Sequence, residues 1–247
     1  MPADRPGPGA SAAIAEARRL ANGLDPRLSY HDAFHTFYEV LPAARRLATA
    51  AGVNATTRRR LEVAACFHDL GFLRLPRPDG RTPRPSEVEA DAEPLRDARG
   101  TGHEQASVEL MRSTCAPLGF GGDALDEISG MILATRLPQR PRTLGERLMA
   151  DADLALLGSG TFPNRNERLR LERAQLGERL SRPSWLRSQI RFLLRHRFTS
   201  TEGERLFGVV RRRNAAILRA RLQRLVRLGT DRSPPGRSSL HRSPRQG

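Results

Sequence analysis

The side chains of this sequence best suited to chemistry are the neighbours His68 and Asp69, which lie near the end of an apolar stretch. Burying an imidazole beside a carboxylate is costly unless the charges are paired or bound to a metal. Another imidazole, His35, lies upstream, and two carboxylates, Asp151 and Asp153, lie downstream. The order His, His-Asp, Asp therefore predicts a metal site.

The types of these ligands indicate which ion would bind. Two imidazoles and two carboxylates suit a borderline or hard divalent cation, so the sequence predicts one Mn, Fe, Co, Ni, Zn or Mg ion. His68 and Asp69 are consecutive, so both reach one ion only where a helix ends, and Gly71 favours such an end. Asp151 and Asp153 lie about 200° apart around a helix, so we expect only one of them to face the ion.

The elements that must position these residues are helices. Apolar residues recur at helical spacing and almost no segment alternates like a strand, so the expected fold is all-α. His35 falls in a helix that begins near Asp32. Within this segment, a kink or break is expected at Pro42. The His-Asp pair ends a helix over 57–70. The other expected helices span 12–21, 103–112, 124–135, 144–157, 165–180, 184–196 and 201–228.

Composition divides the 247 residues into four parts. Residues 1–11, rich in Pro, Gly and Ala, and residues 229–247, rich in Ser, Pro and Arg, are expected to be disordered. Residues 12–160 are expected to form a metal-binding core, on which Arg-rich helices over 161–228 pack. Within the core, residues 75–102 form a long connection rich in Pro and charge, and such loops tend to be mobile or functional.

The positive charge is confined to the end of the chain. The formal net charge is +15, but residues 1–160 carry 20 Arg against 21 acidic residues, whereas residues 161–247 carry 22 Arg against 6. The chain has no Lys, which is consistent with a compositional bias toward Arg. Nucleic-acid binding by the basic C-terminal region is an alternative that we do not favour, because the region lacks the interleaved aromatic residues of single-strand binders.

The remaining compositional features predict a cytoplasmic protein. Cys66 and Cys115 show no Cys-x-x-Cys spacing, so both are expected to be free thiols in a reducing compartment. The N-terminus lacks a basic region followed by an apolar run. No apolar stretch approaches the roughly 20 residues that a membrane helix needs, so we expect no membrane contact.

Five motifs together resemble the HD superfamily of metal-dependent phosphohydrolases, in particular its small bacterial predicted phosphohydrolases. The resemblance covers about residues 30–160, and the helices after Trp185 are also similar to the C-terminal part of such proteins. The motifs are more specific for the fold than for a substrate. They are Tyr30-His31-x3-His35-Thr36, Ala64-Ala65-x2-His68-Asp69-x-Gly71, His103-Glu104-x2-Ser107, Ile132-x-Ala134-Thr135 and Ala150-Asp151-Ala152-Asp153-Leu154-x2-Leu157-Gly158.

The resemblance implies an HD-type helical bundle in which His35, His68, Asp69 and Asp153 hold one divalent ion. It also implies hydrolysis of a phosphate ester, such as a nucleotide or another small phosphorylated molecule. The ion would polarise the phosphoryl oxygen and lower the pKa of a bound water. Arg136 and Leu137 stand where we would look for a further histidine of the two-metal members, so one ion is favoured. The Gly-Tyr-Pro-type signature of the cyclic-di-GMP phosphodiesterases is absent.

Asp69 and Glu104 are the expected catalytic residues, and each neighbouring polar residue has a structural alternative. Glu104, with His103 beside it, would act as a base or hold a water, or it would stabilise a helix N-terminus. His31 and His103 are alternative ligands or supports of the ligands.

Two further residues leave alternatives open. Asp151, which like Asp153 follows an alanine, is an alternative last ligand. Arg136 would neutralise a phosphate, although a solvated position is the simpler expectation in so Arg-rich a chain. A metal-bound regulatory protein without catalysis, or a nucleic-acid-binding protein, is the alternative to the enzyme.

Overall fold

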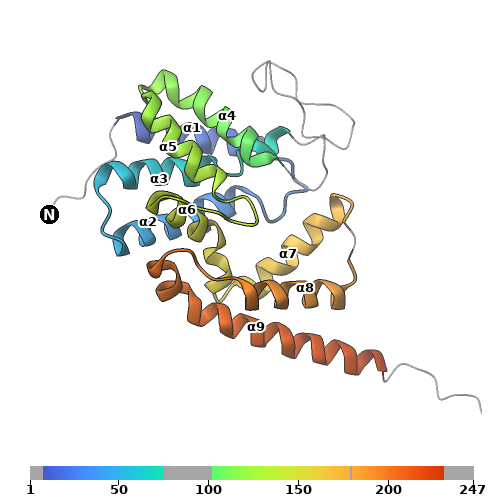
Figure 1. Cartoon of the computed structure of the whole chain (residues 1–247). Coiled ribbons are helices and arrows are strands. Elements are labelled where there is room, and N and C mark those ends of the chain that lie inside the picture. The colour runs from blue at the N-terminus through green and yellow to red at the C-terminus, as the bar shows by residue number, and fades with distance from the viewer. Residues whose placement is uncertain (1–7, 75–101, 179, 231–247) are drawn as a thin grey trace, which may run out of the picture.

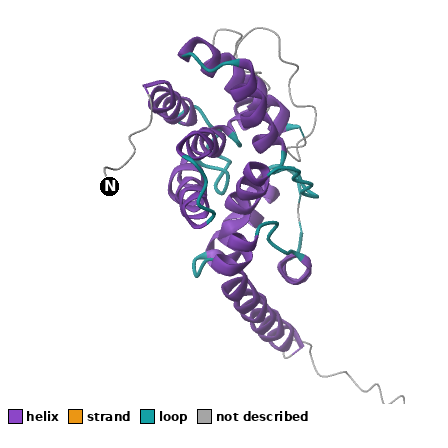
Figure 2. Ribbon diagram, turned by 60° about the vertical axis from the view of Figure 1, so that its left-hand side comes forward, coloured by secondary structure: helices purple, strands orange, loops and turns teal. Residues whose placement is uncertain are grey.

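The computed structural model describes residues 8–74, 102–178 and 180–230 (Figure 1). These residues form helices joined by loops and turns, and no strand occurs among them (Figure 2), which confirms the all-α expectation for this part of the chain. The α-helices are α1 (Pro8–Ala21), α2 (Leu41–Ala50), α3 (Ala55–Phe67), α4 (His103–Cys115), α5 (Gly122–Leu133), α6 (Leu144–Asp153), α7 (Phe162–Gln175), α8 (Arg182–Arg195) and α9 (Thr201–Thr230).

Helix α3 lies at the centre of the molecule, and its last two turns are buried on all sides. It packs against α1, α2, α5 and α6, and every residue from 61 to 67 is buried. Its start is fixed by Asn54, whose side chain accepts a hydrogen bond of 2.8 Å from the Thr57 amide. Because α3 ends inside the protein, the next residue, His68, is completely buried.

The helix that carries His35 begins with a wide π-helical segment, η1 (His35–Val40), that leads directly into α2. Asp32 caps it by accepting a 2.8 Å hydrogen bond from the His35 amide. At its end, the Leu41 amide donates to the carbonyl of Thr36, five residues earlier. Pro42 has no amide hydrogen to continue the pattern, so the irregularity expected at this proline is a wide turn rather than a break.

The turn after His68 is fixed against α4 by Ser107. The Ser107 hydroxyl donates to the His68 carbonyl (2.6 Å) and accepts from the Gly71 amide (2.8 Å). A Cβ atom on Gly71 would lie 1.9 Å from the His103 carbonyl oxygen, so only glycine permits this approach. Together these contacts hold the short 3₁₀ helix η2 (Leu70–Arg74) on α4.

The C-terminal helices lie along one side of the bundle, where α9 runs beside α8 and extends beyond it (Figure 1). Helix α9 also contacts α2, α6, α7 and the 3₁₀ helix η4 (Leu154–Gly158). The Asn214 amide donates to the carbonyls of Leu157 and Ser159, at 2.8 Å each. The described part of the basic region is thus packed on the helices that precede it.

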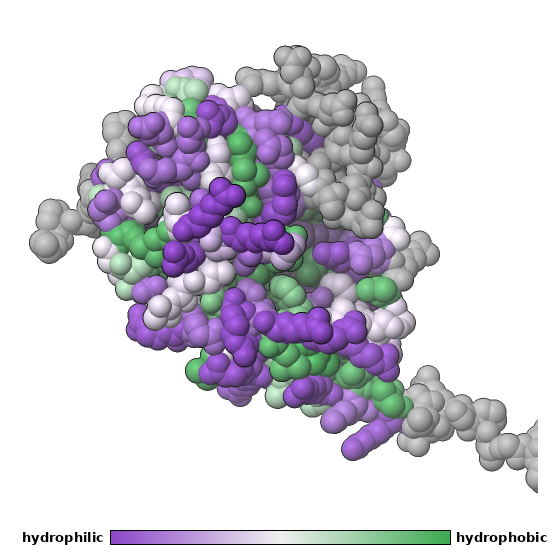
Figure 3. All heavy atoms as spheres, viewed as in Figure 1, coloured by the Kyte–Doolittle hydropathy of each residue, from purple (hydrophilic) through white to green (hydrophobic). Residues whose placement is uncertain are grey.

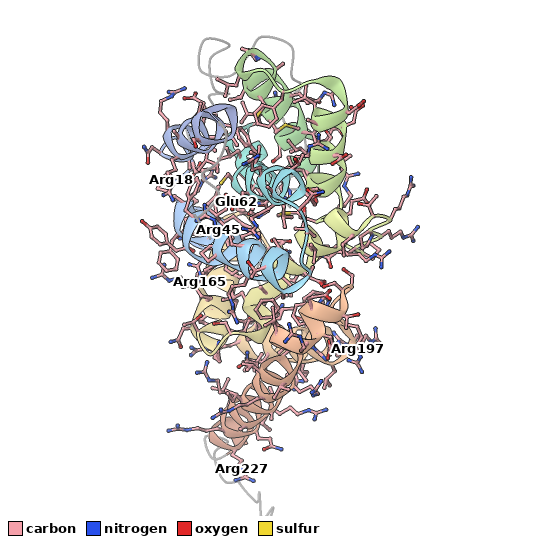
Figure 4. The ribbon with its side chains drawn as sticks, turned by 90° about the vertical axis from the view of Figure 1, so that its left-hand side faces the viewer. Arg18, Arg45, Glu62, Arg165, Arg197 and Arg227 are labelled. Carbon is pink, nitrogen blue, oxygen red and sulfur yellow. The ribbon has the colours of Figure 1, made fainter. Side chains whose placement is uncertain are left out.

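Most of the arginines of α9 face solvent. Figure 3 shows a largely hydrophilic face with an apolar strip near α9, and Figure 4 shows Arg227 near the far end of this helix. Arg212 and Arg213 are exposed, in agreement with a solvated basic face, but Arg211 is buried and donates to the Leu193 carbonyl. Burial lowers the pKa of Arg211. One arginine of this run is therefore part of the interior.

Several expected boundaries differ from the structure. Residues 8–11, expected to be disordered, form the first turn of α1. The helix expected over 165–180 ends at Gln175, because Gly177 with φ of 98° terminates it. The expected tail at 229–247 begins inside α9, which continues to Thr230. The rest of that tail, residues 1–7 and the connection over 75–101 lie outside the described residues.

Two further expectations concern the described residues. Cys66 and Cys115 are free thiols, and both are buried. Within the described ranges, no helix combines the length and the apolar character needed to cross a bilayer.

Candidate metal centre

Three predicted ligands from three elements meet in one place. Nitrogen atoms of His35 and His68 and a carboxylate oxygen of Asp153 lie within 4.8 Å of one another. Asp153 Oδ1 is 3.6 Å from His35 Nε2 and 3.5 Å from His68 Nε2. Bonds of 2.0–2.2 Å to one ion would place ligand atoms about 3 to 4 Å apart. These three side chains could therefore hold a divalent metal ion.

Asp69 reaches the same cluster with one of its two oxygens. Its Oδ2 lies 3.0 Å from His68 Nε2 and 3.8 Å from His35 Nε2. Its Oδ1 lies 3.3 Å from His103 Nε2 on α4. The consecutive residues His68 and Asp69 can both face the cluster because α3 ends between Phe67 and His68.

The two imidazole rings are oriented by hydrogen bonds on their outer nitrogens. His68 Nδ1 lies 2.9 Å from the Ala65 carbonyl, and His35 Nδ1 lies 3.0 Å from Glu39 Oε2. Since both partners are oxygen acceptors, each Nδ1 carries the hydrogen. Both Nε2 atoms then remain available to the cluster, which is the arrangement usual behind metal-binding histidines.

Two atoms of the cluster give an independent test of whether a metal fits. His68 Nε2 and Asp69 Oδ2 are buried and face each other at 3.0 Å as an ion pair, but neither has a well-directed hydrogen bond with a described residue. A poorly directed pair satisfies buried polar atoms only in part. An ion between the four side chains would satisfy both atoms, so the donor set fits a divalent metal.

The charges of the cluster shift the pKa values of its members in opposite directions. Burial alone would lower the pKa of His35, but hydrogen bonds to Asp153 and Glu39 raise it to about 9. Burial would likewise lower that of His68, but the nearby carboxylates of Asp69 and Asp153 raise it well above its usual value. Without a metal, both rings are thus protonated at neutral pH.

The carboxylates show the complementary shift. Burial would raise the pKa of Asp153, but hydrogen bonds to His35 and His68 lower it to about 2. The pKa of Asp69 is lowered well below its usual value, because its interactions with His68 and His103 outweigh burial. Two imidazolium rings and two carboxylates therefore neutralise one another in the metal-free protein.

This charge balance predicts that metal binding strengthens as the pH rises. A metal must displace the protons of His35 and His68, so we expect affinity to increase by up to about 100-fold per pH unit between pH 7 and 9. Calorimetric titration in buffers of different ionisation enthalpy counts the protons, and about two should be released per ion at pH 7. An affinity that is constant over this range would contradict the protonated cluster.

The stability of the metal-free protein should depend on the same groups. Protonated histidines stabilise it, whereas protonation of the aspartates destabilises it. The stabilisation from protonated His35 is complete below pH 6.5 and is lost as the pH rises through about 9. The stabilisation from ionised Asp153 is complete above pH 3.8 and is lost as the pH falls through about 2.

The alternative last ligand, Asp151, faces away from the cluster and has a structural role. Its Oδ1 accepts from the Thr199 amide (2.6 Å) and hydroxyl (2.9 Å), and its Oδ2 accepts from the Ser200 amide (2.8 Å) and hydroxyl (2.5 Å). Burial raises the pKa of Asp151, against the lowering effect of these bonds. Asp151 thus fixes the start of α9, while Asp153 joins the cluster.

Glu104 lies beside the cluster on the first turn of α4 and is buried. Its Oε2 forms no hydrogen bond with a described residue and lies 3.6 Å from Arg136 Nε and 3.7 Å from His103 Nδ1. His103 in turn stacks on Phe72, with ring centroids 4.1 Å apart. Glu104 was expected either to lie at a helix N-terminus or to lie beside the metal ligands. In the structure it does both.

His31 lies outside the three-residue cluster and is paired with Glu172 of α7. Its Nδ1 forms a short hydrogen bond with Glu172, whose other oxygen accepts from the amides of Tyr30 (2.7 Å) and His31 (3.0 Å). Burial would raise the pKa of Glu172, but the charge of His31 and these hydrogen bonds lower it. This carboxylate ties α7 to the segment before the first ligand.

A cavity of about 600 Å³ borders the cluster. The predicted ligands Asp69 and Asp153 line it together with His31 and Glu104, and α7 and α8 supply walls of both apolar and polar side chains. Figure 1 shows these two helices facing the bundle that carries the ligands. The volume is in the range of pockets that enclose small organic molecules.

The residues that support the ligands from outside were not predicted from the sequence. Glu39 bonds to His35 from four residues along the chain, a spacing that helical geometry makes recognisable. Arg165, which binds Glu39 through its Nε (3.0 Å to Oε1) and the Tyr30 carbonyl through its NH2 group (2.8 Å), lies more than 120 residues away. No local pattern could have identified Arg165 or Glu172.

The predicted ligands and the residues around them thus form one site from four separate segments of the chain. His35, His68, Asp69 and Asp153 meet, His103 and Glu104 flank them, and His31 faces the same cavity. Comparison with known proteins gives this site no relative: no protein-family model, curated protein or solved structure matches the chain.

Proposed function

We propose that this chain is an HD-type phosphohydrolase that hydrolyses a small phosphate ester and holds one divalent ion through His35, His68, Asp69 and Asp153. The observation that carries the proposal is the convergence of two imidazole nitrogens and two carboxylates beside a cavity of small-molecule size.

The reaction divides between the ion and the side chains. When bound, a divalent ion polarises a phosphoryl oxygen and lowers the pKa of water toward neutrality. Arg136 and Arg173 line the cavity and supply positive charge for the phosphate. The guanidinium of Arg136 also lies near Glu104 and keeps that carboxylate oriented.

Glu104 is suited to take the proton from the attacking water. Its Oε2 is buried beside the cavity and has no hydrogen-bond partner among the described residues, so it can accept one from water. The water oxygen forms the new bond to phosphorus, Glu104 takes a water proton, and the ester oxygen leaves with the bonding electrons. General-base assistance of this kind contributes about 10²- to 10⁴-fold.

His31 is suited to give a proton to the leaving oxygen. Glu172 holds its Nδ1, so its Nε2 is the nitrogen left for a substrate. We expect His31→Gln to reduce hydrolysis of an alkyl phosphate by about 10²- to 10⁴-fold. Hydrolysis of p-nitrophenyl phosphate, whose leaving group needs no proton, should fall by less than about tenfold. The rates for both esters in the wild type and the variant make the test.

Glu172→Gln is the matched control for this experiment. It should produce the same selectivity in a weaker form, because the amide still positions the ring but no longer stabilises its charge. Equal losses for both esters in both variants would show that His31 positions the site and does not donate a proton.

The proposal as a whole is tested by a hydrolysis screen of the purified full-length chain. Nucleotides, cyclic nucleotides and simple phosphate esters are incubated with Mn, Fe, Co, Ni, Zn or Mg, and phosphate release is measured. We expect turnover that requires the metal and is lost in Glu104→Gln. A chain that binds about one metal ion yet hydrolyses no ester would instead support a metal-bound regulatory protein.

A further inference from the structure

The walls of the cavity contain two polar side chains that the proposed reaction does not use. Asn166 on α7 and Trp185 on α8 both line it and are 2% and 3% exposed. Asn166 Oδ1 and Trp185 Nε1 are buried, and neither forms a hydrogen bond with any described residue. Buried polar atoms without partners are rare in folded proteins, and here two of them border one cavity.

The chemistry of these two atoms is complementary. The indole nitrogen only donates a hydrogen bond, and the amide oxygen only accepts one. Phe162, Leu169 and Phe192 line the same cavity with apolar side chains that favour a flat organic group, and Ser188 and Gln189 add polar groups to the wall. A ligand that satisfied both atoms would therefore need an acceptor and a donor on a flat ring.

We propose that α7 and α8 form a specificity site for the organic part of the phosphate ester, and that this part is a heterocycle with a lactam edge. The ring carbonyl accepts from Trp185 Nε1, and the ring N–H donates to Asn166 Oδ1. This inference rests on the proposed function, since the phosphate of the same molecule lies at the metal ligands. It makes Trp185 and Asn166 determinants of substrate choice.

Two phosphonates test this selectivity, because their C–P bond resists hydrolysis. One is the phosphonate analogue of uridine 5′-phosphate, which carries a lactam edge, and the other is phenylphosphonate, whose flat ring has no hydrogen-bonding group. Calorimetry with the Mn-loaded full-length chain gives both dissociation constants, and their ratio measures the preference for the heterocycle. We expect Trp185→Phe and Asn166→Leu each to reduce this preference by about fivefold to tenfold.

Phe192→Leu is the matched control, since it trims an apolar wall of the same cavity without removing a polar atom. It should weaken both phosphonates to the same extent. A wild-type chain with no preference for the heterocycle, or a preference unchanged in both polar variants, would overturn the specificity site. The proposed hydrolysis fails separately, if the chain binds the uridine analogue selectively but releases no phosphate from any ester.

Discussion

Replacing His68 or Asp69 with alanine should reduce the bound metal from about one ion per chain to a small fraction of that and abolish hydrolysis. Each substitution removes one ligand atom of the cluster, either His68 Nε2 or Asp69 Oδ2, and neither atom has a well-directed hydrogen bond with a described residue. A divalent ion supplies several kcal/mol of transition-state stabilisation, so the rate should fall by about a thousandfold or more. Elemental analysis after dialysis measures the metal, and phosphate release measures the rate.

The same experiment needs proof that the variants fold. Each substitution leaves the remaining charges of the buried cluster unbalanced, so the unfolding midpoint of the metal-free variants should fall, whereas circular dichroism well below that midpoint should still show the helix content of the wild type. His196→Ala is the control, because this partly buried histidine lies outside the cluster and should leave the metal content unchanged. A metal content unaffected by either His68→Ala or Asp69→Ala would reject the metal centre.

Asp151 and Asp153 are two residues apart, yet we expect only one of their alanine variants, Asp153→Ala, to lose the metal. Asp151→Ala leaves two amides and two hydroxyls of Thr199 and Ser200 without an acceptor. We expect a loss of about 3 kcal/mol in the free energy of unfolding, with the metal still bound by the native fraction. Asp153→Ala should instead remove the metal from the folded protein, and its metal-free form should also lose stability because His35 and His68 lose a balancing carboxylate.

Urea unfolding of the metal-free proteins and metal analysis of the folded ones separate the two outcomes. Asp151→Asn is an informative intermediate, since its amide keeps one oxygen acceptor and should lose less stability than alanine. If Asp151→Ala lost its metal with unchanged stability, the assignment of the two aspartates would be reversed.

The sequence predicted those parts of the site that depend on neighbouring residues. The end of α3 brings His68 and Asp69 to one place, and the angle between positions two apart on a helix separates Asp151 from Asp153. The sequence could not identify Asp153 as the member of the pair that faces the cluster by geometry alone. That choice depends on Thr199 and Ser200, which lie just before α9 and nearly fifty positions after Asp151, the residue that they bind.

The helix boundaries that differ from those expected depend on contacts or conformations that the spacing of apolar residues does not reveal. The apolar spacing continues past Phe67, but Ser107 holds the following turn in a different conformation. Residues 8–11 look like a flexible end, yet a Cβ on Gly9 would lie 2.8 Å from the Leu118 carbonyl, so this end packs on the distant 3₁₀ helix over Ala116–Leu118. Both errors arise because tertiary contacts override local preference.

The bond between Asp151 and the start of α9 has a consequence for the order in which the protein is made. A Cβ on Gly203 would lie 2.2 Å from Asp151 Oδ2, so α9 begins directly against the helix that carries Asp153. The last turn of α6 therefore gains its final partners only after residues 199–203 have been synthesised. A ribosome-bound fragment that ends near residue 160 should hold the ion weakly, and firm metal capture should mark the arrival of the C-terminal helices.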